Sequence, residues 1–223
     1  MEYINPPARS GVLVLFDLDG TLSRQNTFLS YLAQAVLRRP SRLRRLPLLL
    51  VDVVLHRSGS IDDANLKERF LTALLGGLRK SDLEPWTSRF VESMVRTGLL
   101  IDGVRRLEQH RADGHEVAML TASPDLYVEP LASALGIRHV LCSRTKWEES
   151  RFTGRLAGAN CKGEEKVKCL ELLKEQLRPS TVIAYADDFS DLPLLRAVDR
   201  PVLVNPRRRT RAVARHIPIE RWT

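Results

Sequence analysis

Val12-Leu-Val-Leu-Phe-Asp-Leu-Asp-Gly-Thr21 opens with five apolar residues and continues into a short acidic loop. An unbroken apolar run of this length is typical of a strand that is buried on both faces of a parallel sheet. Asp17 and Asp19 follow directly, so both carboxylates are expected at the carboxyl end of that strand. Open α/β sheets bind their ligands at this end. The stretch therefore predicts an inner sheet strand that carries a functional site, with an ordinary polar turn as the alternative.

The acidic loop resembles the first motif of the haloacid dehalogenase superfamily, Asp-x-Asp-Gly-Thr, whose members are mostly magnesium-dependent phosphatases. The resemblance implies that Asp17 is a nucleophile and Asp19 a general acid/base. The chemistry suits these residue types. A phosphate monoester is a dianion that repels an attacking carboxylate, so the site needs a cation. A carboxylate can form an aspartyl-phosphate, and a second one can protonate the leaving alkoxide and later take a proton from water.

The leaving group distinguishes two reactions of this superfamily, hydrolysis of a phosphate ester and cleavage of a carbon–halogen bond. A halide departs without receiving a proton, whereas an alkoxide needs one. The presence of Asp19 therefore favours phosphoryl chemistry over carbon–halogen cleavage.

Composition favours a globular protein that contacts anions. The chain has 223 residues, a net charge of +8 and a sequence pI of about 9.8. This charge suits phosphorylated substrates, acidic membrane surfaces or nucleic acid. Aromatic residues make up only 6% of the chain, and no stacking platform or helix-turn-helix pattern is present, which argues against nucleic acid.

The cysteines and the first residues favour a cytoplasmic location, with contact at the inner face of the membrane as an option. Cys142, Cys161 and Cys169 are odd in number and lack Cys-x-x-Cys spacing, so we expect reduced thiols. The five histidines have no ligand spacing, and zinc is not expected. The first residues, interrupted by Pro6 and Pro7, do not have the pattern of a signal peptide.

A long insertion separates the first motif from the next strand-like run. In a simple βαβ unit the second strand would begin about 30 residues later, but Thr121 comes 104 positions after Asp17. Ser60 and Ser81 each resemble the start of a capping box, and Gly76-Gly77 is a helix end. We predict a helical cap domain over residues 22–98, with a core domain formed by residues 1–21 and 99–223.

One part of this cap allows two interpretations. A cluster of arginines precedes the apolar run 46–55, which is too short to span a bilayer. The run is either a buried cap helix with a solvated basic end or a basic and apolar surface that lies on anionic lipid. The clustered residues are Arg38, Arg39, Arg42, Arg44 and Arg45. A second arginine run, from Arg207 to Arg215, has the same two interpretations, a solvated face or an anionic-surface contact.

The second motif follows the apolar strand 116–120. Ser123 is a suitable N-cap and Pro124 a suitable first helical residue, so Thr121 is expected at a helix N-terminus, where phosphate binds readily. Ordinary capping is the alternative. The resemblance to the superfamily implies that the Thr121 hydroxyl and the Ala122 amide bind phosphate.

The third motif of the superfamily is a lysine near a helix start, where it offsets the charge of phosphate and nucleophile. Two lysines are candidates. Lys166 fits a Gly-x-x-Lys pattern, and Lys162 fits the Lys-Gly-Glu pattern of phosphoserine phosphatases. We favour Lys166.

The fourth motif, usually Gly-Asp-x-x-x-Asp, resembles the acidic stretch after strand 181–185. Asp187 matches the metal-binding position and Asp191 the second acid, while Asp188 competes for the ligand role. Ala186 stands where glycine is usual. The resemblance implies that Mg²⁺ is held by Asp17, the Asp19 carbonyl and Asp187, a set of oxygens that this ion prefers.

Together these features predict a doubly wound, Rossmann-like α/β core with a helical cap inserted after the first strand. The cap position resembles subfamily IB of the superfamily, the phosphoserine-phosphatase-like branch. The expected activity is Mg²⁺-dependent hydrolysis of a phosphate monoester. Two substrate classes stay open, a soluble metabolite or a phospholipid headgroup, because the cap start at residues 28–39 is similar to C-type phosphatidylglycerophosphatases. A weakly active regulatory module of the same fold is a third alternative. The oligomeric state is not predicted.

Overall fold

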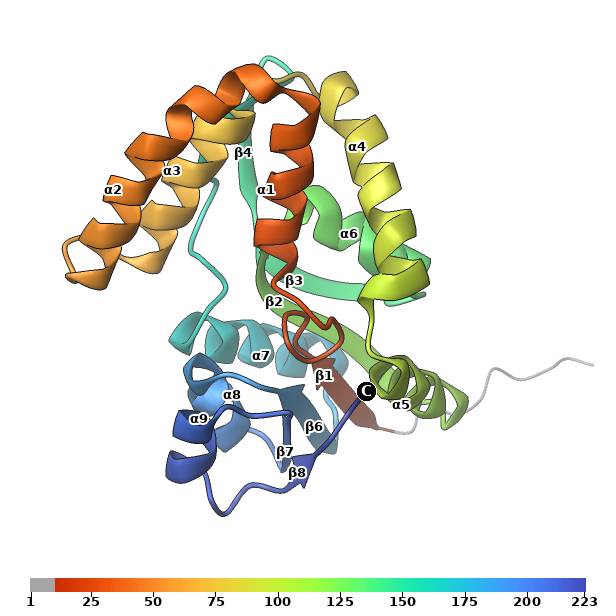
Figure 1. Cartoon of the computed structure of the whole chain (residues 1–223). Coiled ribbons are helices and arrows are strands. Elements are labelled where there is room, and N and C mark those ends of the chain that lie inside the picture. The colour runs from red at the N-terminus through yellow and green to blue at the C-terminus, as the bar shows by residue number, and fades with distance from the viewer. Residues whose placement is uncertain (1–10) are drawn as a thin grey trace, which may run out of the picture.

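The computed structural model describes residues 11–223; the Pro6-Pro7 lead-in therefore lies outside the described residues. The core is a six-stranded sheet in the order β3-β2-β1-β6-β7-β8, and every neighbouring pair is parallel (Figure 1). The strands are β1 (Val12–Phe16), β2 (Glu116–Pro124), β3 (His139–Ser143), β6 (Thr181–Ala186), β7 (Arg200–Val204) and β8 (Ile219–Glu220). The predicted doubly wound α/β core, with the Asp17 strand inside the sheet, is confirmed.

Alternation along β1 divides the apolar core into two layers. Leu13 and Leu15 pack on one face of the sheet with leucines of α7 (Glu164–Leu177) and α8 (Leu192–Arg196). Val14 and Phe16 pack on the other face, towards α5 (Ile101–Ala112) and α6 (Asp125–Ala134). All four side chains are at most 1% exposed, so β1 is buried on both faces as its sequence predicts.

The register of β1 places the candidate site at one edge of the sheet. Phe16 lies opposite Met119 of β2 and Tyr185 of β6. The carboxyl ends of these three strands therefore meet, although β2 begins 100 positions after the last residue of β1. Asp17, Thr121 and Asp187 come just beyond those paired positions and become neighbours.

The insertion is helical, as predicted, and stands over this edge of the sheet (Figure 1). It comprises α1 (Thr27–Arg38), η1 (Pro40–Arg45), α2 (Leu46–Arg57), α3 (Asp63–Leu75), α4 (Lys80–Ser93) and η2 (Met94–Gly98). A hairpin of β4 (Thr145–Glu148) and β5 (Arg151–Leu156) joins this group. The amide of Phe152 donates to the Leu78 carbonyl at 2.8 Å, and the Gly77 amide donates to the Phe152 carbonyl at 2.7 Å.

Two predicted helix starts were wrong by a few residues. Asp62 caps α3 by accepting from the Asn65 amide at 2.7 Å, whereas Ser60 bonds to Ser58 within the preceding turn. At α4 the carboxylate of Asp82 accepts from the Arg79 amide, and Ser81 lies inside the helix. In both places a nearby carboxylate competes successfully for the free amides. Gly76 ends α3 as expected.

The apolar run 46–55 forms α2 but is not buried as a whole. Leu50 and Val54 are 68% and 64% exposed, and Asp52 is on the buried side. Among the helices of residues 11–223, none combines the length and the hydropathy that a membrane span requires. Near the C-terminus, α9 (Arg208–Val213) exposes its arginines to solvent.

Candidate active site

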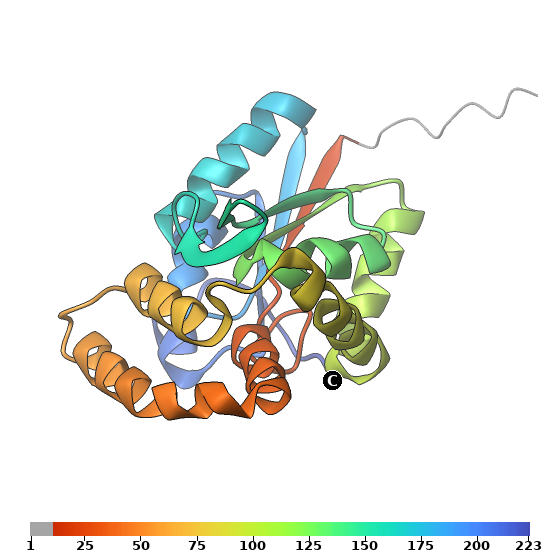
Figure 2. The ribbon, with the colours of Figure 1, turned by 90° about the horizontal axis from the view of Figure 1, so that it is seen from above.

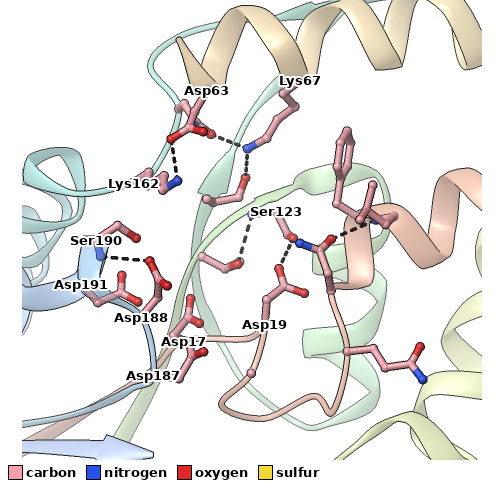
Figure 3. A pocket seen from close by; sticks show the side chains of 18 of the residues that line it. Asp17, Asp19, Asp63, Lys67, Ser123, Lys162, Asp187, Asp188, Ser190 and Asp191 are labelled. Carbon is pink, nitrogen blue, oxygen red and sulfur yellow. Dashed lines mark hydrogen bonds and ion pairs between the residues drawn. The ribbon is translucent and has the colours of Figure 1, made fainter. Parts of the chain in front are cut away.

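The carboxyl ends of β1, β2 and β6 line a cavity of about 570 Å³ together with the start of α7 and the cap helices α1 to α3. Figure 3 shows its carboxylates, with Lys67 and Lys162, from close by. All eight residues that the sequence suggests for the site line this cavity: Asp17, Asp19, Thr121, Ala122, Lys162, Lys166, Asp187 and Asp191.

Lys166 links two of the predicted carboxylates. Its Nζ lies 2.7 Å from Asp17 Oδ1 and 2.7 Å from Asp191 Oδ1, and all three side chains are less than a tenth exposed. Burial raises the pKa of Asp17 well above its usual value, and Lys166 opposes that rise. Burial alone would lower the pKa of Lys166, but the two carboxylates raise it above its ordinary value, so the lysine is charged.

The other candidate lysine has a different partner. Lys162 Nζ forms an ion pair with Asp63 of α3 at 2.5 Å and makes no hydrogen bond to Asp17 among the described residues. It therefore connects the core to the cap. Lys166 is brought to Asp17 because it lies in the first turn of α7, which begins directly after Gly163.

Asp19 is held by groups from two elements. Its Oδ1 accepts from the Thr27 amide at 2.5 Å, and its Oδ2 accepts from Ser123 Oγ at 2.7 Å. Tyr127 in turn donates to Ser123 Oγ at 2.9 Å. Both oxygens of Asp19 are thereby fixed, with its carboxyl group turned towards the cap side of the cavity (Figure 3).

The prediction that Ser123 caps α6 was wrong. Strand β2 continues through Pro124, Pro124 is the N-cap, and α6 starts at Asp125. The Ser123 hydroxyl instead donates a hydrogen bond to Asp19. A serine before a Pro-Asp pair has the sequence pattern of a helix N-cap. The Asp19 carboxylate that accepts its hydrogen bond is distant in sequence, and only the folded chain brings the two together.

Thr121 and Ala122 lie next to Asp17 at the end of β2. Thr121 is 1% exposed, and its hydroxyl accepts from the Ser123 amide at 3.1 Å. The Ala122 carbonyl points the other way, towards α3 and β3, where it accepts from Lys67 and Ser143. Hydrogen bonds therefore hold this part of β2 on both sides.

The carboxylates of Asp17, Asp187 and Asp191 can place one oxygen each within 4.8 Å of one another. Burial, together with the nearby Asp191 and Asp188, raises the pKa of Asp187 to about 7. Asp187 Oδ1 is buried without a hydrogen-bond partner. Lys166 supplies one positive charge to three carboxylates, so the cluster fits a divalent cation that binds oxygen.

Asp188, the competing ligand, is used differently. It caps η3 (Phe189–Asp191), accepting from the Ser190 amide at 3.0 Å. Burial would raise the pKa of Asp188, but the Ser190 amide and hydroxyl lower it below its usual value. Gly20 also matters here, because its backbone has a φ of +81° and a Cβ at this position would collide with the Asp187 carboxylate.

Sequence reasoning missed the residues that the cap contributes. Lys67 of α3 reaches into the cavity, donating to the Ala122 carbonyl at 2.5 Å and to Asn160 Oδ1. Burial, together with the nearby Lys162, lowers the pKa of Lys67 to about 8. Thr27, Tyr127 and Asn160 were missed as well, because isolated polar residues of this kind give no local signal.

The comparisons with known proteins agree with this geometry. The model of the haloacid dehalogenase-like hydrolase family matches residues 14–196. A protein of Mycobacterium tuberculosis named probable phosphatase is 28% identical over 213 residues, which are 92% of this chain and 73% of that protein.

Solved structures share the architecture. A Bordetella pertussis protein of unknown function superposes with a TM-score of 0.80 at 27% identity and covers 93% of this chain and 97% of its own. A substrate-bound phosphoserine phosphatase has a TM-score of 0.68 at 17% identity over 93% of this chain and 92% of its own, which shows a shared fold. The chain belongs to the haloacid dehalogenase-like hydrolase family. The predicted family and the hydrolase class are confirmed.

Proposed function

We propose that this chain is a Mg²⁺-dependent phosphatase that hydrolyses a phosphate monoester through an aspartyl-phosphate on Asp17. The observation that carries the proposal is the ion-pair cluster of Asp17, Lys166 and Asp191, with the unpartnered Asp187 oxygen beside it. The relative named probable phosphatase supports the same reaction class.

Each residue has a separate task in the proposed reaction. The Mg²⁺ ion, held by Asp17, Asp187 and the Asp19 carbonyl, would offset the negative charge of the phosphate when bound. Lys166 orients Asp17 Oδ1 and offsets charge on the phosphoryl oxygens. Thr121 and the Ala122 amide bind those oxygens from the β2 side, and Asp191 holds Lys166 in place.

Asp19 carries out the proton transfers. Its carboxyl group gives a proton to the leaving alkoxide as Asp17 attacks phosphorus, and then takes one from the water that hydrolyses the aspartyl-phosphate. The hydrogen bonds from Thr27 and Ser123 keep it oriented for both steps. Because Thr27 begins cap helix α1, the position of the cap and that of the acid are linked.

The cavity suits a substrate with an anionic phosphate and a mixed leaving group. Lys67, Lys162 and Arg24 line its cap side, and Phe28, Leu29, Val53, Leu66 and Phe70 form an apolar wall. The lysines support a soluble metabolite with a second anionic group, such as phosphoserine. The apolar wall supports the alternative, a phospholipid headgroup such as phosphatidylglycerophosphate.

The test is phosphate release in the presence of Mg²⁺ or EDTA. A panel of soluble phosphomonoesters is compared with phosphatidylglycerophosphate in mixed micelles. Turnover that requires Mg²⁺ supports the proposal, and the preferred ester identifies the substrate class. Undetectable hydrolysis of every ester would instead favour a regulatory or binding module of the same fold.

A further inference from the structure

Helix α2 turns its apolar side towards solvent. Leu50, Val51 and Val54 are 68%, 56% and 64% exposed. The one acidic residue of the helix, Asp52, faces inwards, where it accepts from Arg69 of α3 at 2.6 Å. Surface helices normally place their apolar residues inside and their charges outside, so this arrangement leaves an unpartnered aliphatic face.

Basic residues flank this face. Arg38, Arg44 and Arg57 are exposed, and their guanidinium groups have no hydrogen bond or ion pair with any residue in the part of the chain that the structure describes. Their neighbours Arg42 and Arg45 are used internally, donating to carbonyls at the end of α3. Asp52 is the only acid among residues 38–57, so the outward side of this segment carries no acidic side chain.

We propose that this surface, the α2 face formed by Leu50, Val51 and Val54 with Arg38, Arg44 and Arg57, docks on an anionic lipid membrane. Figure 2 shows α1 and α2 along one outer edge of the molecule, where a planar surface can reach them. The helix has 12 residues, about 18 Å of length. It therefore lies in the plane of the headgroups, with its aliphatic residues in the acyl boundary and its arginines at the phosphates.

Two other occupants fit the chemistry less well. A second copy docked face to face would bring arginine clusters of the same charge together. A protein partner would be expected to meet aromatic anchors, but residues 37–57 contain no Trp, Tyr or Phe. Anionic lipid matches both the charge and the purely aliphatic face.

The test is flotation of the full chain with vesicles of phosphatidylcholine, alone or with about one-third phosphatidylglycerol. We expect binding at low salt to the anionic vesicles only, and its loss at about 1 M salt, where charges are screened within roughly 3 Å. Replacing Arg38 and Arg44 by Gln should lower the partition coefficient roughly 25-fold, about fivefold for each arginine. The triple variant L50Q/V51Q/V54Q should lower it at least about tenfold.

Matched controls lie elsewhere on the surface. Leu172→Gln replaces a leucine of α7 that is 60% exposed, and the pair Arg208→Gln and Arg211→Gln removes two exposed arginines from α9. Both controls should bind as the wild type does. Because none of the α2-face substitutions lines the cavity, hydrolysis of a soluble ester should be unchanged in all variants, which separates this test from that of the proposed function.

Four results would overturn the proposal. The first is no flotation with anionic vesicles at low salt. The second is an equal loss of binding in the α9 control, which would assign the effect to overall charge. The third is a dimer in light scattering that dissociates in the triple variant, which would assign the face to a second copy. Binding to polyglutamate that the triple variant retains in full, without vesicle binding, would indicate an acidic protein partner instead.

Discussion

The ammonium group of Lys166 lies 2.7 Å from a carboxylate oxygen of Asp17 and 2.7 Å from one of Asp191. A single buried lysine thus supports both the proposed nucleophile and the acid of the fourth motif. This relationship distinguishes Lys166 from Lys162, which pairs with Asp63 of the cap.

Replacing Lys166 by Met should lower kcat by at least about 100-fold, since one oriented donor at a developing charge contributes that much. It should also destabilise the fold by about 3–5 kcal/mol, because it leaves buried carboxylates without their cation. Steady-state kinetics and urea denaturation measure the two effects. Lys162→Met is the matched control, and a loss of kcat as large as that of Lys166→Met would contradict the assignment.

Asp19→Asn should lower kcat by about 10²–10⁴, the usual contribution of a positioned acid/base. With p-nitrophenyl phosphate, whose leaving group needs little protonation, the first step should persist while hydrolysis of the intermediate slows. Rapid-quench kinetics should then give a burst of nitrophenol. Ser123→Ala removes one hydrogen bond to Asp19 and should cost only about tenfold. Equal, uniform losses in both variants without a burst would count against the acid/base role.

Lys67 should determine the affinity for substrates that carry a second anionic group. Lys67→Met is expected to raise KM for phosphoserine about tenfold and to change KM for p-nitrophenyl phosphate much less. Because burial and the nearby Lys162 lower the pKa of Lys67 to about 8, the wild-type KM for phosphoserine should rise above that pH as the ammonium loses its proton. Lys67→Arg keeps the charge, so it should move this rise to higher pH. The same KM profile in all three proteins would contradict the assignment.

His110 should make the fold sensitive to acid. Burial, together with the neighbouring His115 and Arg106, lowers the pKa of His110 to about 4. The unfolded chain takes up this proton near pH 6.5 and the folded chain only near pH 4. The stabilisation is therefore complete above pH 6.5 and is lost as the pH falls towards 4, by up to about 3 kcal/mol.

Urea denaturation at several pH values between 7 and 4 tests this prediction. His110→Gln should show a shallower loss of stability with acid than the wild type, while His216→Gln, at an exposed position, should keep the wild-type slope. Parallel slopes in all three proteins would show that His110 is not the group responsible.

Much of the core and the place of the clustered carboxylates could be predicted from sequence because buried parallel strands have a strong local pattern. Asp17 and Asp187 each follow such a strand, and parallel pairing brings strand ends to one edge. The choice between Lys162 and Lys166 was harder, since both precede or begin the same helix. The choice depends on which of the two side chains faces the core. Lys166 is the buried one, and it therefore reaches Asp17.

The cap could be predicted only in outline. Helix α2 is apolar around most of its circumference, so periodicity does not say which side is buried, and the inward position of Asp52 depends on Arg69 of another helix. Lys67 and Asn160 meet in the cavity although 93 positions separate them along the chain. Contacts of this kind come from tertiary packing, and no local pattern encodes them.

The most direct test of the central claim is mass spectrometry of enzyme quenched in acid during turnover, together with Mg²⁺-dependent phosphate release by the wild type and Asp17→Asn. The account predicts a phosphoryl group on the Asp17 peptide of the wild type, and loss of both that group and turnover, by at least about 10³-fold, in the variant. A phosphoryl group on another residue, or near-normal Mg²⁺-dependent turnover in Asp17→Asn, would contradict it.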